Sequence, residues 1–173
     1  TFPFHPTEWL LVMDGFVSMI EEKNIQFDVV AGIETAGIPH SAALGFMLQK
    51  PSVFIRKAAK DHGTKKMVEG GDVNGKSVLL IEDHVTTGGS SLHGVHELRN
   101  AGGVVRDLLA ITSYEFAVAD TQFSSEHIHL HTLTTFAYIL EEALERKMLS
   151  SQQVDTVKDW LRDPEGWEQR QGK

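Results

Sequence analysis

The sequence of 173 residues contains no cysteine and no long apolar run. The absence of cysteine excludes a disulfide framework and thiolate chemistry. No apolar run reaches the roughly 20 residues that a membrane-spanning helix needs, and no signal peptide is visible. We therefore expect a single domain over residues 1–173 with an ordinary hydrophobic core, a cytoplasmic location and no membrane partner.

Basic charge is also scarce, because 16 lysines and arginines stand against 24 acidic residues and give a net charge of −8. This balance argues against nucleic acid as the main partner, since such binding depends on a basic surface. Five of the sixteen basic residues nevertheless fall within positions 56–66. One basic segment in an acidic protein indicates a compact anionic ligand.

Apolar spacing predicts an alternation of helices and strands. Helices are expected over 7–24, with Thr7 as the N-cap, and over 36–49, 88–101, 115–125, 133–147 and 151–162. Strands are expected at 27–31, 52–56, 77–83, 104–112 and 128–131. Such alternation predicts βαβ units, and therefore an α/β fold with a doubly wound, mostly parallel sheet and helices on both faces. Residues 57–76 are polar and lack periodicity, which predicts a long flexible loop with a functional role.

The strongest functional signal is the stretch VLLIEDHVTTGGSS at 78–91. It predicts a buried strand that ends in two carboxylates, at the sheet edge where α/β proteins bind ligands. The small residues that follow offer free N–H groups, hydroxyls and a helix N-terminus, which suit a phosphate. Carboxylates do not bind phosphate, but they suit the hydroxyls of a sugar or a magnesium ion. The stretch therefore predicts a sugar-phosphate site, with a capped turn and solvated acids as the alternative. The predicted binding residues are Glu82, Asp83, His84, Val85, Thr86, Thr87, Gly88, Gly89 and Ser90.

This stretch resembles the signature of the type I phosphoribosyltransferases. In that family the acids hold the ribose hydroxyls of phosphoribosyl pyrophosphate, and the loop holds its 5-phosphate. The turn at 31–39 looks like the family's pyrophosphate loop, which assigns Thr35, Ala36 and Gly37 to substrate binding; an ordinary turn between strand and helix is the alternative. The resemblance also implies Mg²⁺ bound together with the substrate, and no residue of this chain is assigned to the metal.

The segment Arg56–Gly63 resembles the catalytic loop of orotate phosphoribosyltransferases, Arg-x-x-x-Lys-x-His-Gly. Departure of pyrophosphate leaves a cationic ribosyl centre and a highly charged leaving group, so cations that close over the site stabilise the developing charge and exclude water. We expect Arg56 to bind pyrophosphate and Lys60 to neutralise it. His62 is expected to donate a proton or hydrogen bond, and Lys57 to contact substrate.

In the family this loop completes the neighbouring subunit's site, so the resemblance implies a homodimer joined through loop 56–66. A solvated basic surface is the better interpretation of Lys65 and Lys66. Three histidines that alternate at 127–131 suggest either a zinc site or the outward face of a half-exposed strand, and we favour the strand.

The resemblance extends over roughly residues 8–167 and implies transfer of ribose 5-phosphate to orotate, in pyrimidine biosynthesis. Thr86 is expected to contact the base. No arginine stands at 111–115, where some family members bind orotate through one, so another base is an alternative substrate. A non-catalytic sensor of phosphoribosyl pyrophosphate is a further alternative, and the intact basic loop argues against it. The family's N-terminal hood segment is not evident before Thr7.

Overall fold

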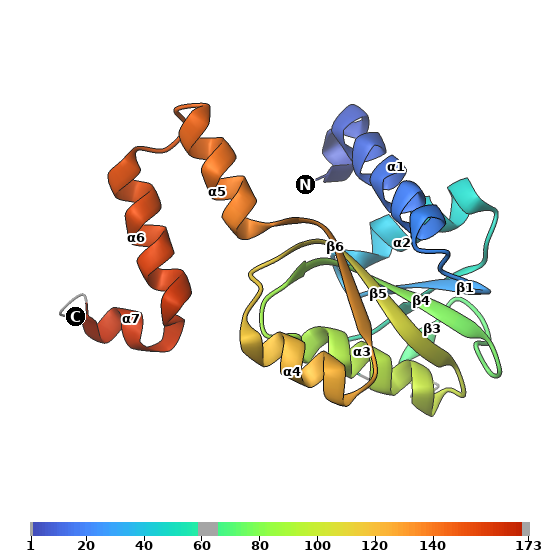
Figure 1. Ribbon diagram of the computed structural model, residues 1–173. Coiled ribbons are helices and arrows are strands. Elements are labelled where there is room, and N and C mark those ends of the chain that lie inside the picture. The colour runs from blue at the N-terminus through green and yellow to red at the C-terminus, as the bar shows by residue number, and fades with distance from the viewer. Residues whose placement is uncertain (1, 59–65, 171–173) are drawn as a thin grey trace. The chain divides into compact units, whose positions relative to one another are not determined.

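The computed structural model describes residues 2–58 and 66–170, and it has the expected α/β fold (Figure 1). Six strands form one sheet in the order β3-β2-β1-β4-β5-β6. The strands are β1 (Val29–Ile33), β2 (Ser52–Ile55), β3 (Val68–Glu69), β4 (Ser77–Val85), β5 (Val104–Ser113) and β6 (His129–Thr135). β2, β1, β4 and β5 pair in parallel, which confirms the doubly wound, mostly parallel sheet.

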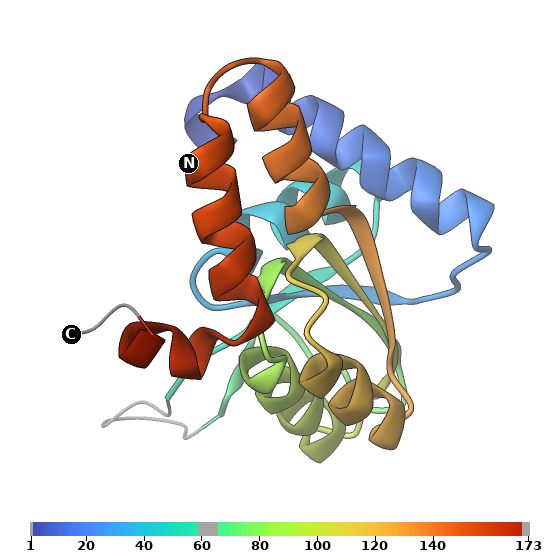
Figure 2. The same cartoon turned by 60° about the vertical axis from the view of Figure 1, so that its left-hand side comes forward.

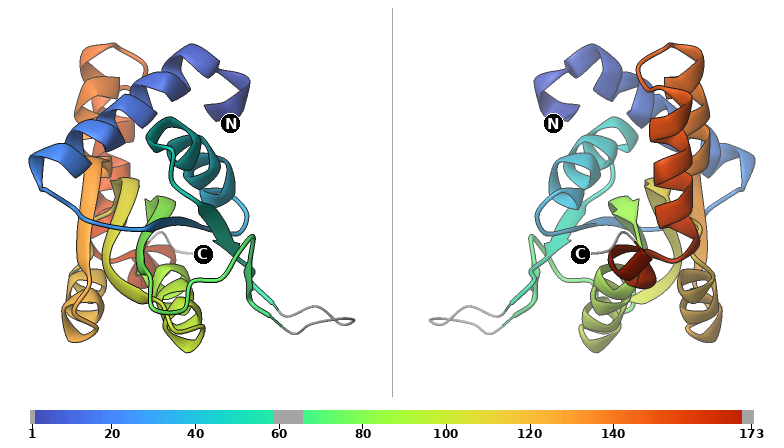
Figure 3. Two further views of the ribbon diagram at one scale, coloured as in Figure 1. Left: turned by 90° about the vertical axis from the view of Figure 1, so that its right-hand side faces the viewer. Right: turned by 90° about the vertical axis from the view of Figure 1, so that its left-hand side faces the viewer.

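The helices of the sheet-containing part cover both faces of the sheet. These helices are η1 (Phe2–Phe4), α1 (Pro6–Glu22), α2 (Gly37–Leu48), α3 (Gly89–Asn100) and α4 (Ala117–Ser125). Figure 2 shows α3 and α4 side by side on one face, and Figure 3 shows α1 crossing α2 on the other. The central strands are therefore buried on both sides, which explains why their sequences are continuous apolar runs.

Two apolar clusters form the core, one on each face of the sheet. On the α1/α2 face, Leu79 and Ile81 of β4 pack with Phe16 of α1 and Leu44 of α2. On the α3/α4 face, Leu80 of β4 joins residues of α3 and α4, among them Val95, Leu98, Ala119 and Phe123. Successive residues of β4 thus pack against opposite helix layers.

Three local predictions are corrected. The segment 57–76 is not structureless throughout, because Val68–Glu69 pairs antiparallel with Phe54–Ile55 as strand β3. α1 begins at Pro6 with His5 as its N-cap, so Thr7 lies inside the helix. Proline suits the first helical position because its φ is already fixed and its missing N–H is not needed there. The helix Pro164–Arg170 (α7) was not expected from the sequence.

The chain divides into two compact units, Thr1–Leu133 and Thr134–Lys173. The second unit contains α5 (Phe136–Glu145), α6 (Ser151–Arg162) and α7. Ser150 and Gln153 form a reciprocal capping box that starts α6, and Arg170 pairs with Asp163 across α7. In the part of the chain that the structure describes, no helix has the length and apolar character needed to cross a membrane.

Candidate active site

Three segments that carry predicted site residues leave the same edge of the sheet. In the parallel register Ile33 lies opposite Ile55, and Gly32 lies opposite Ile81. The carboxyl ends of β1, β2 and β4 are therefore adjacent, and the segments 34–37, 56–58 and 86–90 start beside one another. This is the edge at which open α/β sheets bind ligands.

Glu82 and Asp83 lie at the end of β4 in different environments. Glu82 is only 6% exposed, and its carboxylate accepts hydrogen bonds from the Asp83 N–H (3.2 Å) and the Ser90 hydroxyl (3.4 Å). The pKa of Glu82 is raised to about 8, chiefly by burial and then by the side chain and charge of Asp83. The hydrogen bonds from the Asp83 N–H and the Ser90 hydroxyl lower it by less. Asp83 is half-buried, and its Oδ1 accepts the His84 N–H at 2.8 Å. The pair thus offers one carboxyl group that holds a proton at neutral pH beside a second, more accessible one.

The raised pKa of Glu82 predicts a pH-dependent stability of the free protein. The folded state retains a proton up to about pH 8, whereas the unfolded chain releases it near its ordinary value of 4.5. The contribution to the free energy of unfolding is therefore fully present below the ordinary pKa and is lost as pH rises through about 8. Urea unfolding between pH 5 and pH 9 should show this decline, and Glu82→Gln should flatten it. If the free energy of unfolding varied with pH in the same way in both proteins, that result would contradict the raised pKa of Glu82.

The turn after β4 has the features of an anion site. Gly88 adopts a φ of +87° as the N-cap of α3, and an added Cβ there would lie 2.9 Å from the Phe123 ring, so only glycine fits. The side chains of Thr86 and Thr87 are exposed, as are Gly89 and Ser90 in the first turn of α3. Exposed hydroxyls and free N–H groups therefore surround the positive end of the α3 dipole.

The turn after β1 is held tightly against α2. A Cβ on Gly32 would lie 2.4 Å from both the Gly37 carbonyl oxygen and the Ser41 hydroxyl, so β1 passes directly beneath the first turn of α2. Thr35 and Ala36 are exposed just before this helix, whereas Gly37 is buried within its first turn. The predicted pyrophosphate turn is thus packed closely against α2 and has two accessible residues at its tip.

Glu34 ties this turn to the basic segment. Its Oε2 accepts the Lys57 N–H at 2.9 Å, and its own N–H donates to the Ile55 carbonyl at 2.9 Å. Arg56 is half-buried and contacts Glu69 of β3, with 3.2 Å between Nη1 and Oε1. Arg56 and Lys57 therefore lie at the same edge as the carboxylate pair. Lys60 and His62 lie outside the described residues.

Two residues of the predicted set do not present side chains to this surface. Val85 is buried in the apolar cluster on the α3/α4 face, so only its backbone is available to a ligand. The His84 ring packs edge-on against Tyr114 with centroids 4.4 Å apart, and burial lowers the pKa of His84. Its Nε2 is buried and has no hydrogen-bond partner within the described residues. The His84 side chain therefore has a packing contact with Tyr114 in this structure.

Sequence reasoning missed Glu34 and His40, which the structure brings to this edge. His40 lies in the first turns of α2, is 3% exposed and accepts a hydrogen bond from Trp9. One signal in the sequence could have identified it, namely a histidine within the otherwise small and apolar run of 36–48. Glu34 gave no signal, because its partner is a backbone N–H from another segment.

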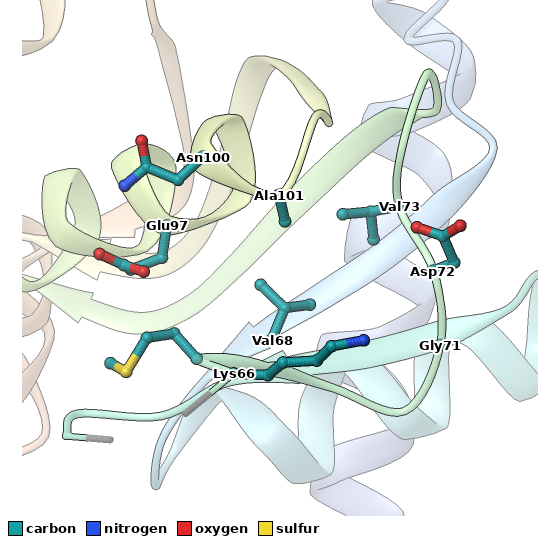
Figure 4. Close-up of a pocket in the computed structure, with 9 residues that line it drawn as sticks. Lys66, Val68, Gly71, Asp72, Val73, Glu97, Asn100 and Ala101 are labelled. Atoms are coloured by element: carbon teal, nitrogen blue, oxygen red, sulfur yellow. The ribbon is translucent and has the colours of Figure 1, made fainter. Parts of the chain in front are cut away.

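A pocket of about 390 Å³ lies elsewhere, between β3 and the last turn of α3 (Figure 4). It is lined by Lys66, Val68 and Asp72 on one side and by Glu97 and Asn100 on the other. The pocket and the turn at 86–90 therefore lie at opposite ends of α3. None of the residues predicted to bind substrate lines this pocket.

A carboxylate pair near the end of a central parallel strand, followed by a glycine- and hydroxyl-rich turn, fits the sugar-phosphate site that the sequence predicts. The family model for the phosphoribosyl transferase domain matches residues 5–109. The chain belongs to the phosphoribosyltransferase family.

Within this family the chain groups with the orotate phosphoribosyltransferases. It is 34% identical to the orotate phosphoribosyltransferase of Coxiella burnetii over 95% of this chain and 78% of that one. It is 39% identical to the enzyme of the same name from Listeria monocytogenes serotype 4b, over 82% and 68% of the two chains. The crystal structure of orotate phosphoribosyltransferase from Aeropyrum pernix superimposes with a TM-score of 0.71 at 26% identity, covering 79% of this chain and 76% of that one.

Proposed function

We propose that this protein transfers the ribose 5-phosphate of phosphoribosyl pyrophosphate to orotate, giving orotidine 5′-monophosphate and pyrophosphate in pyrimidine biosynthesis. The observation that carries the proposal is the carboxylate pair of β4 beside the anion-binding turn, in a chain whose relatives are named orotate phosphoribosyltransferases. The site residues lie within one phosphoribosyltransferase domain, which we propose to span residues 1–173.

The proposed roles follow from the chemistry of each segment. Asp83 and Glu82 bind the ribose hydroxyls, and the turn at 86–90 binds the 5-phosphate with its N–H groups and hydroxyls. The turn at 35–37 and the basic residues Arg56, Lys57, Lys60 and His62 bind the pyrophosphate. A ring nitrogen of the base attacks the anomeric carbon, and the electron pair of the broken carbon–oxygen bond leaves with pyrophosphate. Cations over the leaving group stabilise the transition state more than the ground state.

Magnesium fits this site as a companion of the substrate. Within the described ranges no group of three or more His, Asp or Glu side chains is arranged to hold a metal ion. Mg²⁺ needs fewer protein ligands than that, since it binds through one or two carboxylates, substrate phosphates and water. Asp83, the more accessible carboxylate of the pair, would supply the protein's oxygen ligand. The bound ion would neutralise charge on the leaving pyrophosphate.

A homodimer is part of the proposal. Large apolar side chains remain exposed on α1 and α2, including Leu10 (53%), Leu11 (68%) and Phe46 (87%). An apolar surface of this kind is typical of an interface. In the proposed dimer the loop 56–66 completes the site of the partner. Both substrates are small soluble molecules, and we propose a cytoplasmic location.

The direct test of the proposed function is release of pyrophosphate when orotate, phosphoribosyl pyrophosphate and magnesium are supplied together. A coupled pyrophosphate assay should respond only when all three are present. The fall in orotate absorbance should match the pyrophosphate formed. Omission of orotate is the control for simple hydrolysis of the substrate.

The identity of the base has one specific alternative, because β5 ends in Thr112 and Ser113 where an arginine would suit a carboxylated base. Ser113 is buried, with 1% exposure, and its hydroxyl accepts the Glu115 N–H at 3.0 Å. A panel of purine and pyrimidine bases decides between the substrates. Turnover with another base and none with orotate would contradict the proposal, and binding without turnover of any base would indicate a sensor.

A further inference from the structure

The pocket between β3 and the last turn of α3 has a buried apolar base and a polar rim (Figure 4). The base contains Val68 and Val73, which are 9% and 1% exposed. The rim carries Asp72 on one side and Glu97 on the other. A volume of about 390 Å³ falls within the range of small-molecule sites, which is about 300–1,000 Å³. The pocket therefore has the size and the mixed lining of a site for a small ligand.

Glu97 brings an uncompensated negative charge to this pocket. Its side chain is half-buried and forms no hydrogen bond or ion pair within the described residues. The basic residues nearest to it along α3, His96 and Arg99, both pair with Glu126 instead, at 3.1 and 2.8 Å. A carboxylate near the C-terminus of a helix also faces the negative end of the helix dipole, which disfavours its charge. A positively charged ligand would therefore stabilise this side of the pocket.

The opposite side of the pocket carries no excess charge. Lys66 and Asp72 both lie there (Figure 4), and Oδ1 of Asp72 already accepts the Asn74 N–H at 3.0 Å. One ammonium group against two carboxylates leaves a negative excess, which lies on the Glu97 side. The Asn100 side chain on that side has no hydrogen-bond partner within the described ranges, and its carbonyl oxygen can accept from an ammonium group.

The lining matches an organic cation better than a metal ion. In the part of the chain that the structure describes, no three His, Asp or Glu side chains are arranged to hold a metal ion. The valine side chains at the base offer no oxygen ligands, but they suit an apolar group. A ligand that suits both the base and Glu97 therefore joins an apolar body to one ammonium group.

The pocket also lies against the short strand that holds Arg56. Met67 and Val68 line the pocket, and the Arg56 N–H donates to the Met67 carbonyl at 2.9 Å. Val68 lies opposite Ile55 in the antiparallel register, and the next residue, Glu69, holds the Arg56 guanidinium at 3.2 Å. A ligand packed against Val68 would therefore stabilise β3 in the position in which Glu69 neutralises Arg56.

We propose that this pocket binds a small organic amine, and that the bound amine keeps Arg56 paired with Glu69 and so weakens the binding of pyrophosphate. The ammonium group binds Glu97 and the Asn100 carbonyl oxygen, and the apolar body packs against Val68. The effect on pyrophosphate rests on the proposed function, which assigns that ligand to Arg56. By thermodynamic linkage, bound pyrophosphate weakens the binding of the amine by the same factor.

The test of the site compares 3-methylbutylamine with 3-methylbutanol, which has the same apolar body without the charge. Titration of the free protein, followed by NMR, should give a Kd of about 1 mM for the amine and binding about tenfold weaker for the alcohol. Glu97→Gln should weaken amine binding about tenfold and leave alcohol binding unchanged. Asn100→Asp, which adds a second carboxylate on this side, should strengthen amine binding about threefold.

Glu22→Gln is the matched control. It also removes an exposed carboxylate from the last turn of a helix, but Glu22 belongs to α1 and does not line the pocket. This variant should bind the amine as the wild type does. Absence of amine binding to the wild type would overturn the site, and so would equal amine affinity in the wild type and Glu97→Gln.

Calorimetry with pyrophosphate tests the effect on Arg56. Saturating 3-methylbutylamine should raise the Kd for pyrophosphate about fivefold in the wild type and leave it unchanged in Glu97→Gln. Binding of the amine in the pocket without a change in pyrophosphate affinity would overturn the connection through β3.

The amine titration uses no substrate, which keeps the proposed site separate from the proposed function. If the unsubstituted protein turns over no base, the transferase proposal fails while binding of the amine is still measured. If turnover is normal and the amine does not bind, only the amine site fails.

Discussion

Replacing Gly32 with alanine is expected to lower the melting temperature by roughly 5–10 °C and to abolish most of the turnover. The added Cβ would lie 2.4 Å from the Gly37 carbonyl oxygen and the Ser41 hydroxyl, and 2.6 Å from the Gly37 carbonyl carbon. Backbone atoms cannot give way at such distances, so α2 must move away from β1. That movement would displace Thr35 and Ala36, the accessible tip of the turn that we propose binds pyrophosphate. Thermal unfolding and the pyrophosphate assay measure the two effects.

Gly71→Ala is the matched control for this substitution. A Cβ at Gly71 meets only the Val53 side chain, at an ordinary contact distance of 3.6 Å. The control should melt and turn over as the wild type does. A Gly32→Ala protein that behaves like the control would show that β1 and α2 are not in close contact at this point.

Lys60→Ala is expected to lower kcat by about 10²–10³-fold while the KM for phosphoribosyl pyrophosphate changes much less. The physical reason is that a cation over the leaving group gains most of its interaction as charge develops on pyrophosphate. Lys60 lies outside the part of the chain that the structure describes, so the expectation comes from the sequence of Arg56–Gly63. Lys66→Ala, in the solvated part of the same basic segment, is the control. Equal losses in kcat and in substrate affinity would make the loop a binding element only.

Mixed dimers test which of the two subunits supplies the loop to each site. Lys60→Ala and Asp83→Asn proteins should each be nearly inactive. If the loop serves the partner's site, each heterodimer carries one site with both defects and one intact site. Equal mixing should then restore about one quarter of the wild-type activity after subunit exchange. No recovery, in a mixture whose exchange is verified by differently tagged chains, would place Lys60 in the site of its own subunit.

The parts of the fold that the sequence could predict are those governed by local pattern. Buried parallel strands require continuous apolar runs, and this requirement identified β4 and β5 closely, whereas β1 lies two residues later than the expected strand at 27–31. β3 was missed because two residues, Val68 and Glu69, are too few to show alternation and are held only by pairing with β2. The start of α1 was misplaced by two residues because a threonine suggested a side-chain cap, while Pro6 fixes the first turn by its backbone geometry.

The same distinction between local sequence pattern and long-range contact applies to the site. The Glu82–Ser90 stretch was predictable because strand end, carboxylates and phosphate turn follow one another along the chain. The raised pKa of Glu82 was not predictable, since it depends on burial by elements distant in sequence. The contacts of Glu34 with Lys57 and of Trp9 with His40 span 23 and 31 residues. Such pairings arise only when α1, α2 and β2 meet, and no local pattern encodes them.

In the free protein, the carboxylate of Glu69 is already paired with Arg56, as an anionic ligand would be. Glu69 on β3 holds the guanidinium 3.2 Å away at the site edge before any substrate arrives. In the proposed function, arriving pyrophosphate would displace this counter-ion from Arg56, so the gain on binding would be the difference between two charge-assisted contacts. Under that proposal Arg56 would contribute more to discrimination between strongly and weakly charged ligands than to affinity, because a multiply charged anion competes better with a carboxylate already in place. The two-residue strand β3, through Glu69, would thus determine how much negative charge a ligand needs in order to bind Arg56.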